Sequence, residues 1–84
     1  MIKQVVAVKD RLTGFTSVLL EENTAVAKRQ FKAAFNQRLY VDKSDFELYK
    51  LGTFDTSNGK FEILDTPELL MTGNEVTPNV PDTV

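Results

Sequence analysis

The fold is decided by residues 45–62, which read DFELYKLGTFDTSNGKFE. Two aromatic-bearing runs flank a turn, in which Asp55 accepts backbone hydrogen bonds and Asn58-Gly59 tolerates the left-handed conformation. Gly52 interrupts the first run, as is typical of a bulge or of a close approach by another backbone. The stretch therefore predicts a tight antiparallel β-hairpin.

A second hairpin is predicted at the start of the chain. Residues 2–8 alternate as a strand does, and residues 15–20 form another β-branched and apolar run. Gly14 lies between them and is free to take positive φ. These two strands precede the helix and the hairpin of residues 45–62.

A helix is predicted from about Thr24 to Arg38, capped by Asn23 or Thr24. Apolar residues recur at offsets of four, seven and eight, the spacing of one helical face: Ala27, Phe31, Ala34 and Phe35. We expect this stripe to pack on a sheet.

These elements predict an α+β fold of order ββαββ, with about four antiparallel strands and one helix packed on one face. The last strand is predicted to end at Leu64. Residues 1–66 should form a single domain, and residues 67–84, which hold all three prolines, a flexible acidic tail.

Composition disfavours catalysis. The chain has neither Cys nor His, so it lacks thiolates and imidazoles for metal binding, nucleophilic attack or proton transfer. We expect no enzyme activity, no cofactor and no metal site. No segment approaches about 20 apolar residues, so we expect no membrane association and a location in the cytoplasm.

Charge is segregated along the chain. Residues 1–43 carry eight Lys and Arg against four Asp and Glu, whereas residues 44–84 carry two against eight. The predicted helix has four cations and no carboxylate: Lys28, Arg29, Lys32 and Arg38. Either carboxylates elsewhere in the fold and solvent balance these cations, or the cations bind phosphates.

Single-stranded nucleic acid binding also needs aromatic rings on which bases stack. Tyr40 and Tyr49 are the candidate rings, beside the cations of the helix. The alternative for Tyr49 is a place in the core.

One helix covers only one face of a sheet. Val5, Ala7, Tyr49 and Leu51 are predicted to face away from it, which leaves apolar area to be hidden by a second subunit or a ligand. We therefore expect a homodimer.

The run of residues 45–61 also resembles a family pattern. It reads DF-x-LY-x-LG-x-FD-x-x-x-G-x-F and is similar to the small nonstructural protein of gokushovirus-type microviruses, phages with circular single-stranded DNA genomes. The resemblance extends loosely over residues 1–64. It implies DNA binding that helps move replication to single-stranded synthesis or genome packaging, but it supplies no functional residue.

Two classes of function follow. The first is a DNA-binding phage accessory protein that prefers single strands without strong sequence preference. The second is a dimeric interaction module or assembly factor that acts on a phage or host protein without nucleic acid.

Overall fold

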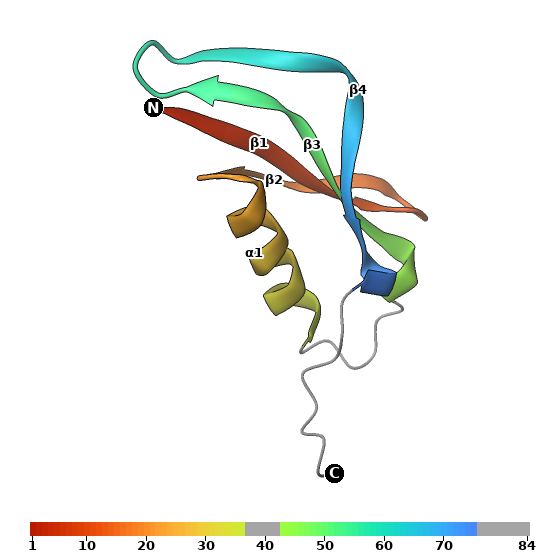
Figure 1. The fold of residues 1–84 in the computed structure, drawn as a ribbon. Coiled ribbons are helices and arrows are strands. Elements are labelled where there is room, and N and C mark those ends of the chain that lie inside the picture. Colours follow the sequence, from red (N-terminus) through yellow and green to blue (C-terminus); the bar gives the residue numbers. More distant parts are fainter. Residues whose placement is uncertain (37–42, 76–84) are drawn as a thin grey trace.

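The computed structural model of this chain describes residues 1–36 and 43–75 of the 84. Figure 1 shows one helix lying against one side of a twisted sheet. The elements in chain order are β1 (Ile2–Asp10), β2 (Gly14–Glu21), α1 (Thr24–Asn36), η1 (Lys43–Asp45), β3 (Phe46–Asp55), β4 (Lys60–Thr72) and η2 (Gly73–Glu75). The four strands form one antiparallel sheet in the order β2-β1-β3-β4. The predicted ββαββ fold is confirmed.

The turn between β3 and β4 has the predicted chemistry. The Asp55 carboxylate accepts the N–H of Ser57 at 2.8 Å, and the Asn58 side chain accepts the N–H of Lys60 at 3.0 Å. Gly59 has a φ of 74°, in the left-handed region that glycine adopts without a steric penalty. Local side-chain hydrogen bonds therefore fix this turn.

Helix α1 begins where a capping residue predicts it. The Asn23 side chain accepts the N–H of Val26 at 2.9 Å, which satisfies one of the free donors of the first turn. Asn23, and not Thr24, is the cap. The part of the predicted helix beyond Asn36, including Arg38, lies outside the described residues.

The core lies between α1 and the sheet. It joins the helical residues to one residue from each of three strands and comprises Val6, Ala27, Phe31, Phe35, Leu48 and Met71. The Phe35 ring packs 4.8 Å from both Phe31 and Phe46, centre to centre. Ala34, the fourth residue of the predicted stripe, is exposed at the edge of this interface.

Strand β4 is longer than the sequence predicted. We expected the last strand to end at Leu64 and a tail to begin at residue 67, but β4 continues to Thr72 and places Met71 in the core. Pro67 misled the prediction, because proline cannot donate to a ladder. Here β4 is an edge strand, and Pro67 falls in a bulge between Ile63 and Glu68, where the register shifts.

This bulge bends β4 sharply near its middle (Figure 1). The backbone of β4 approaches β3 closely beside the bulge. A Cβ added at Gly52 would clash with the carbonyl oxygen of Glu62 and lie 2.9 Å from the Cα of Ile63. Gly52 is therefore required by close backbone approach, as the sequence suggested.

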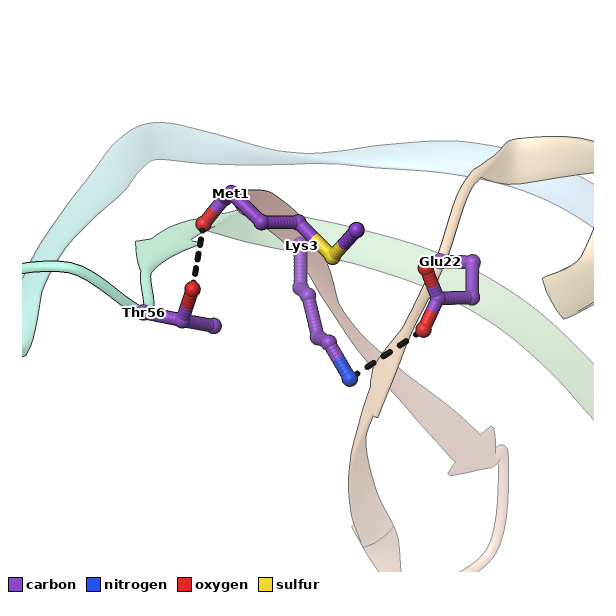
Figure 2. Close-up of polar contacts among 4 residues, drawn as sticks. All are labelled: Met1, Lys3, Glu22 and Thr56. Carbon is purple, nitrogen blue, oxygen red and sulfur yellow. Dashed lines mark hydrogen bonds and ion pairs between the residues drawn. The ribbon is translucent and has the colours of Figure 1, made fainter.

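The start of β1 makes two surface contacts, one with the β3–β4 turn and one with the residue that follows β2. The Thr56 hydroxyl donates to the carbonyl of Met1 at 3.0 Å, and the Lys3 ammonium pairs with the Glu22 carboxylate at 3.2 Å (Figure 2). Both contacts are at the surface, so we expect them to fix the position of the strand while adding little to stability.

Candidate nucleic-acid interface

The outer flank of α1 carries three cations. Lys28, Arg29 and Lys32 line an open, shallow hollow together with Ala25 and Ala33. Ala27, Phe31 and Phe35 are buried against the sheet. Because the helix turns by about 100° per residue, the five positions that line the hollow lie on the side toward solvent. We call Lys28, Arg29 and Lys32 the basic track.

Within residues 1–35 and 44–74, whose side chains the structure describes, no carboxylate forms an ion pair with the basic track. The Lys3–Glu22 pair is the one ion pair among these residues, and α1 contains no Asp or Glu from Thr24 to Asn36. Like charges on consecutive helical turns repel one another. An approaching polyanion relieves that repulsion, so the track is suited to phosphate.

Of the remaining predicted site residues, Tyr49 is the one the structure describes, and it does not join the track. Arg38 and Tyr40 lie outside the described residues. Tyr49 stands opposite Ala7 on β1, one position along from Val8, which contacts the core. Because successive side chains alternate between faces, Tyr49 lies on the side of the sheet away from α1. The predicted combination of this ring with the helical cations is therefore not formed within one chain.

Tyr49 instead belongs to a small cluster on that other face. Its ring meets the edge of Phe15 at 5.5 Å, and the Lys9 ammonium lies 5.5 Å from the Phe15 centroid and 5.8 Å from that of Tyr49. The Tyr49 hydroxyl donates to Glu47 at 3.3 Å. Burial raises the pKa of the Tyr49 phenol, and the Glu47 carboxylate raises it further by repulsion and by accepting the hydrogen bond. The phenol therefore stays neutral at physiological pH.

Sequence reasoning missed Lys9 and Phe15 as members of one cluster. The signal was present in the first predicted hairpin, since a short turn at Gly14 places Lys9 directly opposite Phe15. Opposed residues of an antiparallel pair share a face and contact each other. The contact with Tyr49 also depends on the strand order, which local patterns do not give.

An apolar groove of about 180 Å³ lies between α1 and β2. Helix α1 covers the middle of the sheet and leaves part of β2 uncovered. The groove is lined by Val6, Val8, Thr16, Ser17, Leu19, Glu21, Ala27, Gln30, Phe31, Ala34, Phe35, Phe46 and Leu48. Its walls are continuous with the core, and its volume is that of one or two apolar side chains.

Neither a metal centre nor a membrane span is found among the described residues. They contain no group of three or more Asp and Glu that would hold a metal ion. None of their helices is long and apolar enough to cross a membrane.

Comparison with known proteins places the chain in a family. The family described as Phage ORF5 protein matches residues 3–76, which include every described strand and helix apart from Ile2 at the start of β1. No curated protein and no solved structure matches the chain. Because the match spans far more than half of the 84 residues, the chain belongs to the Phage ORF5 protein family.

Proposed function

We propose that this phage protein is a non-enzymatic accessory factor that binds DNA, preferring single strands without strong sequence preference. It would act in the bacterial host cytoplasm during genome replication, or in the switch to single-stranded synthesis and packaging. The observation that carries the proposal is the basic track, three cations side by side on α1 with no carboxylate partner among the described residues. The resemblance of residues 45–61 to the nonstructural protein of gokushovirus-type microviruses supports the same role.

The chemistry of the track favours backbone contact over base reading. Ammonium and guanidinium groups on an open helical surface bind phosphate charge, which carries no sequence information. Ala25 and Ala33, which complete the hollow, add little that distinguishes one base from another. Binding through the track is therefore expected to tolerate any sequence.

The number of cations in the basic track sets the expected strength of DNA binding. Three phosphate contacts on a single strand give a slope of log K against log salt of about −2. Raising salt from about 50 to 200 mM should then weaken binding by about 20-fold. One chain alone is a weak binder at physiological salt, so function would require high protein concentration or several chains on one strand.

Fluorescence anisotropy with a labelled single-stranded oligonucleotide tests the proposal. The double variant Lys28→Glu/Lys32→Glu should lose at least about tenfold in affinity at low salt, and its salt slope should shrink to about −1 or less in magnitude. Arg11→Glu/Lys60→Glu is the matched control. It makes the same change in net charge at two exposed positions, Arg11 in the β1–β2 turn and Lys60 at the start of β4.

The control decides between a site and a general charge effect. If both double variants weaken binding equally, net charge and not the basic track governs the interaction. If the unmodified protein does not bind at low salt, DNA binding is excluded. A duplex of the same length in the same assay tests the preference for single strands, which requires weaker duplex binding.

A second candidate function is a protein-interaction module. The specific observation in its favour is the set of large apolar side chains exposed on the two edge strands. Under that alternative the anisotropy assay would show no DNA binding at any salt concentration.

A further inference from the structure

The sheet face away from α1 is defined by the strand register. We call it the open face. Val5 stands opposite Leu20 and Gly52, and Ala7 stands opposite Val18 and Tyr49. Directly opposed residues share a face, and neither Val5 nor Ala7 is in the core cluster with Val6. Gly52 and Tyr49 in turn stand opposite Ile63 and Leu69 on β4, so the open face runs across all four strands.

The open face exposes more apolar surface than the sequence suggested, and at different positions. Val5 and Ala7 were expected to need covering, but they are 3% and 0% exposed within the single chain. The exposed side chains come from β2 and β4, on either side of them. Six large apolar side chains, each between 42% and 62% exposed, follow this register: Phe15, Val18, Leu20, Phe61, Ile63 and Leu69.

The area of this surface is large for so small a chain. Side chains of this size that are about half exposed contribute about 80 Å² each, so the six present about 500 Å². That equals a large patch for a typical monomer, where such patches are often functional. Two such faces in contact bury about 1,000 Å², the lower bound for a specific protein interface.

The two edges of the sheet are poorly suited to pairing with another chain. Strand β2 is bulged at Ser17, whose φ of 49° takes that residue out of the ladder with β1. Strand β4 carries Pro67 and its own bulge. Bulges and edge prolines are the features that block edge-to-edge addition of strands. Association through the face is therefore favoured over extension of the sheet.

We propose that the open face docks against the same face of a second copy, related by two-fold symmetry. Apolar side chains then meet apolar side chains across the axis, as an isologous contact requires. The face also holds both signs of charge, with Lys9 directly opposite Glu47 in the register. A two-fold axis can bring each of these groups near its counterpart on the other copy.

The face-to-face dimer also determines how DNA is held, an inference that rests on the proposed function. Helix α1 lies on the far side of the sheet from the open face (Figure 1). Two copies packed through their open faces carry their helices on the outside of a four-layer sandwich. The two basic tracks then point away from each other, so one dimer holds two separate DNA segments and does not form one continuous track.

The oligomeric state of the full chain without DNA tests the inference. Light scattering coupled to size exclusion should give twice the chain mass of 9.5 kDa at micromolar concentration. Val18→Lys, at a position 61% exposed, should give the single-chain mass with an unchanged circular dichroism spectrum. Ile63→Lys on β4 should do the same, and Leu12→Lys, at the 79% exposed residue in the β1–β2 turn, should remain dimeric.

Two results would overturn the inference. They are a single-chain mass for the unmodified protein up to near-millimolar concentration, and dimers in both Val18→Lys and Ile63→Lys. If the unmodified protein is monomeric and Val18→Lys also abolishes DNA binding, the open face is a DNA surface. A dimer that does not bind DNA supports the open-face contact and refutes the proposed function, so the two failures are distinguishable.

Stoichiometry tests the outward placement of the tracks. Titration of labelled DNA at concentrations well above Kd should saturate at two short oligonucleotides per dimer, with the same salt slope for the dimer and for monomeric Val18→Lys. A slope that doubles in the dimer would show that the tracks combine on one strand, and would contradict the face-to-face arrangement.

Discussion

Replacing Gly52 by alanine is expected to destabilise the fold more than the same change at Gly14 or Gly59. The reason is steric and not conformational. The new Cβ would clash with the carbonyl oxygen of Glu62 and lie 2.9 Å from the Cα of Ile63 and 3.0 Å from the carbonyl carbon of Glu62. All three atoms are backbone, so no side chain can rotate away, and β4 itself must move from β3.

The magnitude follows from the cost of overpacking. Forcing backbone apart at a buried site costs about 3 kcal/mol, against a total of about 4–12 kcal/mol for a domain of this length. For a domain of this size, about 3 kcal/mol lowers Tm by about 10–25 °C. Gly52→Ala should therefore remove a large share of the stability.

Thermal and urea unfolding followed by circular dichroism measure this effect, with Gly59→Ala as the control. Gly59 has a φ of 74° and no atom within 4 Å of its added Cβ, so alanine there pays only the left-handed backbone strain of about 1 kcal/mol. If Gly52→Ala costs no more than Gly59→Ala, the close approach of β4 to β3 is not a constraint on this fold.

Three further changes have defined outcomes. Phe31→Ala removes a buried ring from the centre of the helix–sheet core and should cost about 3–5 kcal/mol in urea unfolding; a loss below about 1 kcal/mol would mean that the helix does not pack there. Asn23→Ala deletes the helix cap and should cost about 1 kcal/mol, with Asn23→Ser restoring most of it. In a Tyr40→Phe background, absorbance titration should place the Tyr49 pKa above 10.0, and Glu47→Gln should lower it. Because the pKa of Tyr49 is higher in the folded than in the unfolded chain, the stability that depends on the neutral phenol is complete below pH 10.0 and is lost as pH rises through the folded pKa. An unshifted titration would contradict the burial of this ring.

The features predicted correctly from the sequence are those whose cause is local. Asn58 and Gly59 specify their turn through one side-chain hydrogen bond and one positive φ, and Asn23 specifies the start of α1. Gly52 was identified as a bulge or close approach because a glycine inside a strand pattern usually marks one of these two features. These residues act on their immediate neighbours, so no tertiary information was needed.

The features that escaped prediction depend on partners distant in the chain. The last strand was predicted to end at Leu64, before a tail that begins at Pro67, and only the place of Pro67 in a bulge on an edge strand shows why β4 continues. The bulge at Ser17 has no counterpart in the alternation of residues 14–21. Tyr49 was grouped with the helical cations because charges and rings counted in a sequence do not show which face of the sheet a side chain occupies. The register places Tyr49 on the face away from α1.

The exposed residues of the open face also depend on the strand order and not on local sequence. The prediction of uncovered apolar surface followed from having one helix, and it identified the correct face. It named Val5 and Ala7, which are buried, and not Val18 or Ile63, which are exposed on the edge strands. Exposure depends on the position of a strand within the sheet, and the order β2-β1-β3-β4 is known only from the structure.

The claim that DNA binds the outer flank of α1 is tested most directly by nuclear magnetic resonance. The ¹⁵N-labelled full chain would be titrated with a short single-stranded oligonucleotide at low salt. Binding to the basic track predicts amide shift changes concentrated at Lys28, Arg29 and Lys32, with β2 unaffected. Changes concentrated at Phe15 and Val18, with the α1 amides unmoved, would contradict it.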